Sequence, residues 1–91
     1  MFTKSLAVEF SSKGITINGI APGLTLTPTA ENRYDAGQFD ALIKRIPRGR
    51  AGEKSDIAGL AVFLATDKAD FIAGQTIFVD GGQTIDGFIV K

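Results

Sequence analysis

The sequence contains no cysteine and no histidine, and these two absences exclude several kinds of chemistry. Without cysteine there is no disulfide bond and no thiolate nucleophile, and without histidine there is no imidazole general base and no usual zinc site. No apolar run approaches the ~20 residues of a membrane span, and the first ten residues carry Lys4 and Glu9, unlike a signal peptide. We therefore expect a cytoplasmic protein that does not enter a membrane.

The sequence also has no excess of positive or negative charge. Ten basic and ten acidic residues cancel to a formal net charge of zero, so nothing in the charge favours nucleic acid as a partner. A chain of 91 residues is one domain or part of one, and at this size the fold buries only about 60–65% of the unfolded surface, which makes the core marginal. The group of residues most similar to a basic cluster consists of Lys44, Arg45, Arg48 and Arg50. It is either a solvated face or a contact for a phosphate or a partner.

Periodicity predicts a chain of alternating helices and strands. Phe2, Leu6 and Phe10 recur at the spacing of one helical face, and Gly14 is placed to end that helix. Similar spacing marks two later helices, and β-branched runs mark two strands. The predicted helices cover about residues 1–12, 37–46 and 54–66, and the predicted strands about 15–20 and 75–79.

Two segments carry no periodic pattern. Residues 21–36 are rich in Thr, Pro and Asn and are predicted to be a loop. Residues 83–91 are predicted to be a tail, too apolar for a free solvated end because they include Ile85, Phe88, Ile89 and Val90.

The two strands are separated by helices, which favours parallel pairing. Parallel sheets occur almost only with both faces covered and with more than two strands. The physical pattern alone therefore predicts an α/β arrangement whose sheet is incomplete.

Several short motifs occur in a fixed order along the chain. They are Ala21-Pro22-Gly23 through Thr27, Pro47 to Gly52, Asp56-Ile57-Ala58, Gly74-Gln75 and Val79-Asp80-Gly81-Gly82. Each is a weak signal alone, but together they resemble the C-terminal part of a short-chain dehydrogenase/reductase, and Ser5-Leu6-Ala7 matches the back half of that family's catalytic helix. The resemblance implies an incomplete Rossmann-like three-layer fold, with two parallel strands and about three helices. It also implies that residues 1–91 are the C-terminal part of such a domain.

The resemblance further implies a cofactor-binding loop for NAD or NADP formed by Pro22, Gly23, Thr25 and Thr27. The backbone of Thr25 would hold the nicotinamide carboxamide, and Thr27 would contact the carboxamide or a phosphate. Thr25 departs from the family pattern, in which an apolar residue is usual. Taken alone, the same hexapeptide is a Pro-Gly turn solvated by threonines.

Two other motifs are expected to be structural. The position of Asn18 resembles that of the Asn in the family's strand before the Pro-Gly turn, which implies an amide that satisfies backbone groups of a loop. The segment from Gly49 to Ala58 resembles a family motif that serves in packing and subunit contact.

The family's catalytic groups are not found among these 91 residues. The resemblance places a glycine-rich phosphate loop, an active-site serine and a Tyr-x-x-x-Lys pair upstream of the matched segment. The single tyrosine, Tyr34, is followed four residues later by Gln38 and does not form that pair. No catalytic residue is therefore assigned, and we expect the chain to be inactive alone and to bind cofactor only with the missing N-terminal part.

Residues 27–46 match the family's variable substrate loop in position. Four polar side chains in this loop either bind a substrate or only solvate the loop. If they bind a substrate, they favour a sugar or polyol in an alcohol/ketone reaction. They are Asn32, Arg33, Tyr34 and Gln38.

Three alternatives remain open for the chain as a whole. It is part of an NAD(P)-dependent oxidoreductase, in a homo-oligomer or completed by a complementary N-terminal half. It is a non-catalytic interaction module, or half of a split assembly that pairs with another dehydrogenase chain through unpaired strand edges and apolar helix faces. Or it is a gene fragment or internal-start product without function, because its first helix begins without a cap residue.

Overall fold

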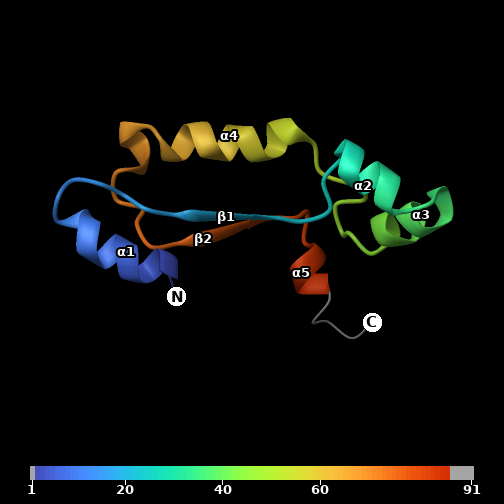
Figure 1. Cartoon of the computed structure of the whole chain (residues 1–91), viewed down its shortest axis with the longest axis horizontal. Coiled ribbons are helices and arrows are strands. Elements are labelled where there is room, and N and C mark those ends of the chain that lie inside the picture. Colours follow the sequence, from blue (N-terminus) through green and yellow to red (C-terminus); the bar gives the residue numbers. More distant parts are fainter. Residues whose placement is uncertain (1, 87–91) are drawn as a thin grey trace.

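The computed structural model describes residues 2–86 as an α/β arrangement of five α-helices, one 3₁₀ turn and two strands (Figure 1). In chain order these are α1 (Phe2–Ser11), β1 (Gly19–Pro22), α2 (Pro28–Arg33), α3 (Ala36–Lys44), α4 (Lys54–Leu64), η1 (Asp67–Ala69), β2 (Thr76–Val79) and α5 (Gln83–Asp86). The predicted α/β class is confirmed, whereas the number of helices is five rather than about three.

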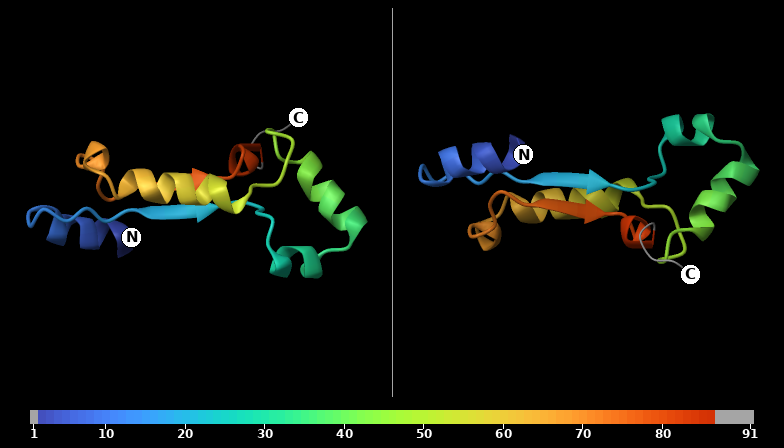
Figure 2. Two further views of the ribbon diagram at one scale, coloured as in Figure 1. Left: turned by 90° about the horizontal axis from the view of Figure 1, so that it is seen from above. Right: turned by 90° about the horizontal axis from the view of Figure 1, so that it is seen from below.

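The two strands pair in parallel, as predicted from the helices between them. Gly19 lies opposite Thr76 and Pro22 lies opposite Val79, so both strands end at the same level. Helix α4 lies along one face of the sheet, and α1 lies on the opposite side near the amino end of β1 (Figure 1). Helices α2 and α3 project beyond the carboxyl ends of the strands (Figure 2).

The first strand begins later than the sequence predicts, at Gly19 rather than at residue 15. Residues 15–18 are not part of the ladder, because the partner strand begins only at Thr76, in register with Gly19. The carbonyl of Ile17 instead accepts the N–H of Gly74 at 2.8 Å. The strand also runs on to Pro22, because the N–H groups that face β2 include those of Gly19 and Gly23, so the proline nitrogen faces the unpaired edge.

Two short helices lie in segments that were predicted to be irregular. Helix α2 interrupts the predicted loop of residues 21–36, where Thr27 caps it and Pro28 occupies its first turn, a combination typical of helix starts. Helix α5 occupies the start of the predicted tail. Neither helix is long enough for apolar periodicity to reveal it. Of the tail's apolar residues, Ile85 is 64% exposed, and Phe88, Ile89 and Val90 lie outside the described residues.

The longer helices agree with the prediction to within two residues. Gly14 follows α1 with a φ of 79°, which ends the helix as expected from a glycine. Helix α3 starts in a capping box. The Asp35 carboxylate accepts the backbone N–H of Gln38, and the side-chain oxygen of Gln38 accepts the backbone N–H of Asp35. None of the helices among residues 2–86 is long and apolar enough to cross a membrane.

Very little apolar surface is buried within the chain. Among residues 2–86 the buried apolar side chains are only Ala7, Ile46, Ala51 and Ala69. The radius of gyration is 15.8 Å, against about 12 Å expected for a compact domain of this length. Large apolar side chains are exposed on helices, loops and the sheet, among them Phe2, Val8, Val62, Phe71 and Phe78. The described residues therefore leave most of their large apolar side chains at the surface and not in a core.

Candidate functional site

The predicted cofactor loop follows β1 at the point where both strands end. The N–H of Gly23 donates to the carbonyl of Val79 at 3.1 Å, which continues the pairing one residue past the strand. A Cβ atom on Gly23 would stand 2.6 Å from the Cβ of Asp80, so only glycine fits here. Pro22 and Gly23 thus lie at the carboxyl ends of parallel strands, the edge where ligands bind in open α/β sheets.

Thr25 presents its backbone to one side of the loop. It forms an isolated parallel bridge with Gly52, in which the N–H of Leu26 and the carbonyl of Leu24 bond to Gly52 at 2.8 Å each. In such a bridge the N–H and carbonyl of Thr25 itself point to the opposite edge. Neither of these two groups has a hydrogen-bond partner within residues 2–86. The Thr25 hydroxyl donates to the carbonyl of Gly23 at 3.0 Å and so braces the turn.

Thr27 lies two residues further on and caps α2. Its hydroxyl oxygen accepts the N–H of Ala30 at 3.1 Å. A hydroxyl that accepts one hydrogen bond still has its own O–H to donate. The structure therefore gives Thr27 a capping role that the sequence analysis did not predict, and it leaves the O–H available.

Gln83 joins this loop from α5, and the sequence analysis missed it. Its Oε1 accepts the N–H of Leu24 at 3.1 Å. The two residues are 59 positions apart, so no local pattern reveals the contact. The only signal in the sequence is a polar side chain directly after the Gly81-Gly82 pair.

Asp80 shapes the turn between β2 and α5. Its carboxylate accepts the N–H groups of Gly82 and Thr84, both at 3.0 Å. The hydroxyl and backbone N–H of Thr84, and then the N–H of Gly82, hold the pKa of Asp80 below its ordinary value. Asp80 therefore acts as an ionised cap for the turn.

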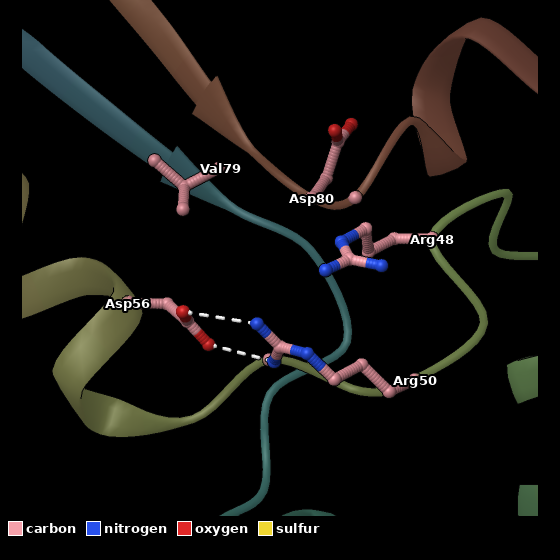
Figure 3. A pocket seen from close by; sticks show the side chains of 7 residues that line it. Arg48, Arg50, Asp56, Val79 and Asp80 are labelled. Atoms are coloured by element: carbon pink, nitrogen blue, oxygen red, sulfur yellow. Dashed lines mark hydrogen bonds and ion pairs between the residues drawn. The ribbon is translucent and has the colours of Figure 1, made fainter.

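The segment that carries Gly52 is held by an ion pair between Arg50 and Asp56 (Figure 3). The guanidinium donates to the two carboxylate oxygens at 2.9 and 3.2 Å, and Asp56 also accepts the N–H of Glu53 at 2.7 Å. The hydrogen bond from Arg50, and then that from Glu53, lower the pKa of Asp56 from 3.8 to about 2. All four members of the predicted basic cluster are exposed, and among the described residues only Arg50 forms an ion pair.

A pocket of about 150 Å³ lies beside the ion pair, between the turn after α3 and the end of β2 (Figure 3). It is lined by Arg48, Arg50, Gly52, Asp56, Val79, Asp80 and Gly81.

Asn18 has the structural role predicted for it. Its amide nitrogen donates to the carbonyl of Ile72 at 2.9 Å, and its amide oxygen accepts the N–H of Gln75 at 3.1 Å. The side chain therefore satisfies two backbone groups of the segment that leads into β2.

The candidate substrate residues are distributed over α2 and α3. Asn32 and Arg33 are exposed on α2. Gln38 uses its side-chain oxygen in the capping box of α3, so that oxygen is occupied by a local contact. Tyr34 lines a pocket of about 370 Å³ between Leu26 and the two helices. Residues 2–86 contain no group of side chains arranged to hold a metal ion.

Comparison with known proteins identifies relatives over nearly the whole chain. The family model described as enoyl-(acyl carrier protein) reductase matches residues 1–84. A tropinone reductase homologue of Arabidopsis thaliana is 43% identical over 90 residues, which cover 98% of this chain and 34% of that protein. An acetoacetyl-CoA reductase of Shinella zoogloeoides is 46% identical over 82 residues, covering 90% of this chain and 34% of that protein.

Solved structures give the same result. A candidate 2-deoxy-D-gluconate 3-dehydrogenase of Agrobacterium tumefaciens with bound NADP is 47% identical with a TM-score of 0.86, covering 92% of this chain and 35% of that one. A gluconate 5-dehydrogenase of Burkholderia cenocepacia in complex with NADP and tartrate is 43% identical with a TM-score of 0.85, covering 93% of this chain and 34% of that one.

The chain spans about a third of the length of the curated relatives it matches. The close superposition confirms the Rossmann-like fold that the sequence predicts. The match to the family model, together with these identities, shows that the chain belongs to the short-chain dehydrogenase/reductase family.

Proposed function

We propose that this chain is the C-terminal part of an NAD(P)-dependent oxidoreductase that transfers a hydride between the nicotinamide and an alcohol/ketone pair. The observation that carries the proposal is the backbone of Thr25, whose N–H and carbonyl have no partner within residues 2–86 and lie just beyond the carboxyl ends of two parallel strands. Two relatives of known structure, at 47% and 43% identity, have NADP bound.

The Thr25 backbone fits the chemistry of a carboxamide. A primary carboxamide offers one carbonyl acceptor and an NH₂ donor, so it pairs with one backbone N–H and one backbone carbonyl. Thr25 offers both groups on one edge, as a strand does to a neighbour. The departure at Thr25 from the apolar residue that is usual in the family does not disturb this fit, because the Thr25 hydroxyl is bonded to the carbonyl of Gly23.

The bound nicotinamide supplies the hydride chemistry, and the residues of this chain would orient it. Thr25 would hold the carboxamide, and the free O–H of Thr27 is placed next along the loop to donate to the carboxamide or a phosphate. These 91 residues contain no Tyr-x-x-x-Lys pair and no glycine-rich phosphate loop. We therefore propose that those groups come from the rest of the domain.

A polyhydroxylated substrate is the class that we favour. Asn32 and Arg33 are exposed on α2, beyond the ends of the strands, where amide and guanidinium groups can bond to hydroxyls or a carboxylate. The Agrobacterium and Burkholderia structures described above, which have NADP bound, carry the names of a deoxygluconate and a gluconate dehydrogenase.

The test is a hybrid protein in which residues 1–91 replace the matching segment of the Agrobacterium relative. We expect the hybrid to bind NADP and to reduce it with 2-deoxy-D-gluconate, followed by the nicotinamide absorbance. Thr25→Pro removes the N–H and should weaken NADP binding about tenfold or more, since one hydrogen bond to the ligand is lost and its partner is left unpaired. Thr25→Ser keeps the backbone pair and the hydroxyl that braces the turn, and it is the matched control. A folded hybrid that does not bind NADP, or that binds it equally well with proline at position 25, would contradict the proposal.

A second candidate, a non-catalytic module that pairs with another dehydrogenase chain, is favoured by the exposed apolar side chains. Phe71 is fully exposed, Val8 is 80% exposed and Phe2 is 76% exposed. Mixing the 91-residue chain with a full-length relative and measuring the mass of the products by ultracentrifugation tests this function. A stable mixed complex without a gain in turnover would favour it, and separate sedimentation would exclude it.

A further inference from the structure

We propose that Gln83 is a positioning residue for the nicotinamide carboxamide, a role that rests on the function proposed above. Its side-chain oxygen accepts the N–H of Leu24 at 3.1 Å, one residue before Thr25. Residue 24 has the same strand parity as Pro22, whose nitrogen faces away from β2, so β2 offers no carbonyl to this N–H. The side chain of Gln83 therefore replaces a missing backbone partner.

The turn after β2 restricts the position of Gln83. Gly81 and Gly82 adopt φ values of 63° and 90°, which reverse the chain, and Asp80 caps the reversal through the N–H groups of Gly82 and Thr84. The N–H of Gln83 donates to the carbonyl of Asp80 at 3.1 Å. A Cβ on Gly81 would approach Ile46 to 2.9 Å, so the turn is also confined by packing.

Glycine at position 23 makes room for the Gln83 side chain. A Cβ on Gly23 would stand 2.9 Å from the Oε1 of Gln83. The same oxygen that accepts the N–H of Leu24 thus lies directly against Gly23. The loop and the Gln83 amide fit together only because residue 23 has no side chain.

Three contacts then fix the orientation of the Thr25 backbone. Gln83 holds the N–H of Leu24, and Gly52 holds the carbonyl of Leu24 and the N–H of Leu26. Without Gln83 the N–H of Leu24 would be left unsatisfied in a partly buried position, and the peptide could tilt to find water. The N–H of Thr25 shares a planar peptide unit with the carbonyl of Leu24, so a tilt that reaches this unit would turn the N–H away from a carboxamide and weaken the bond from Gly52 to that carbonyl.

This geometry predicts an effect on one half of the cofactor only. Under the proposed function Leu24 and Thr25 would lie at the nicotinamide end of the cofactor, whereas phosphate and adenosine contacts in this fold class belong to the first strand–helix turn and the residues after it. Loss of the Gln83 contact should therefore weaken the binding of NADP and leave the binding of adenosine 2′,5′-bisphosphate unchanged, because that compound has no nicotinamide. A merely structural role of Gln83 would weaken both.

The experiment uses the full 91 residues within the hybrid described above and compares two variants with the unmodified hybrid. Gln83→Leu has a similar size but no acceptor, and we expect its dissociation constant for NADP to rise about fivefold to tenfold. Gln83→Glu retains an oxygen that accepts the N–H of Leu24 and should restore most of the affinity. Amide hydrogen exchange of Leu24 should be faster in the leucine variant and slow again in the glutamate variant.

The outcomes separate this inference from the proposed function. If the unmodified hybrid binds NADP and Gln83→Leu binds it equally well, the positioning role is wrong and the proposed function stands. If Gln83→Leu weakens NADP and the bisphosphate alike, Gln83 supports the fold and does not position the carboxamide. If the unmodified hybrid is folded and does not bind NADP, the proposed function is wrong and the role of Gln83 is overturned with it.

Discussion

Gly23 and Asp80 stand in such close contact that a methyl group on Gly23 would lie 2.6 Å from the Cβ of Asp80 and 2.9 Å from its Cα. Real Cβ atoms essentially never approach other heavy atoms so closely, so this contact couples the loop after β1 to the turn after β2. Asp80 also caps that turn through Gly82 and Thr84. The conformation of the candidate nicotinamide loop therefore depends on a residue 57 positions away along the chain.

The first prediction concerns Gly23→Ala. The added methyl group must push the backbone of Asp80 away and would disturb Gln83 as well, so both the turn and the loop should shift. In the hybrid we expect a lower melting temperature and about tenfold weaker NADP binding, because overpacking of this kind costs about 1–3 kcal/mol.

Gly37→Ala is the matched control for that substitution. Gly37 lies in α3, and a Cβ there would meet only the Oδ1 of Asp35 at 3.5 Å, an ordinary contact. Alanine also favours the helix by about 0.5–1 kcal/mol relative to glycine, so stability should be unchanged or slightly higher. Equal effects of the two alanine substitutions would show that the contact between Gly23 and Asp80 does not constrain the loop.

The second prediction concerns the Thr27 hydroxyl, which caps α2 and which we propose also contacts the cofactor. Thr27→Val removes the cap of α2 and the O–H offered to the cofactor, so it should cost about 1 kcal/mol of stability from the cap. It should also weaken NADP binding by about 1–2 kcal/mol if one buried hydrogen bond is lost. Thr27→Ser keeps both groups and should behave as the unmodified hybrid in melting and in titration with NADP. Unchanged NADP affinity in the valine variant would limit Thr27 to its capping role.

The sequence predicted those parts of the fold that depend on local periodicity. Apolar residues spaced along one face located α1, α3 and α4 to within about two residues, and Gly14 marked the end of α1. The parallel pairing and the backbone contacts of Asn18 followed from the order of elements and from the chemistry of an amide. These features are determined by neighbours in sequence or by topology rules that apply to many proteins.

Features that depend on distant partners could not be predicted from local patterns. The bounds of β1 are set by where β2 begins, far along the chain. The contact between Gln83 and Leu24 joins residues 59 positions apart and has no periodic signature. Helix α2 could have been found, because Thr27 followed by Pro28 is a recognised helix start.

The third prediction concerns pH and the pair formed by Arg50 and Asp56. Because the pKa of Asp56 is lowered from 3.8 to about 2 in the folded state, the ionised carboxylate stabilises the fold at pH values above about 4. That contribution is lost as the pH falls from about 4 toward 2. Asp56→Asn should therefore lower the melting temperature of the hybrid near neutral pH, and the difference from the unmodified hybrid should shrink below about pH 4.

Arg50→Gln provides the control for that titration. Hydrogen bonding from Arg50 is the largest cause of the lowered pKa of Asp56, so in the Arg50→Gln background the substitution of Asp56 should have a smaller effect at neutral pH. A difference in melting temperature that stayed constant from pH 7 to below pH 4 would show that charge on Asp56 does not stabilise this turn.

The fourth prediction is that the 91-residue chain alone does not form a stable monomer. A two-stranded parallel sheet leaves strand edges unpaired, and Phe2, Val8 and Phe71 are largely exposed. We expect self-association or a partly molten state that binds a hydrophobic dye, and no NAD(P)-dependent turnover of 2-deoxy-D-gluconate above a buffer blank.

Ile17→Asp tests whether the apolar segment before β1 is covered in the assembled protein. Ile17 is half-buried in the segment before β1, and its carbonyl bonds to the N–H of Gly74. In the hybrid, other layers should cover Ile17, and an unpaired carboxylate there would cost several kcal/mol, so the folded hybrid should not form. Lys13→Asp, at an exposed position after α1, is the control and should leave assembly intact. A sharp cooperative melt of a verified monomer of the 91-residue chain, or normal assembly of the Ile17→Asp hybrid, would mean that the exposed faces need no further layer to cover them.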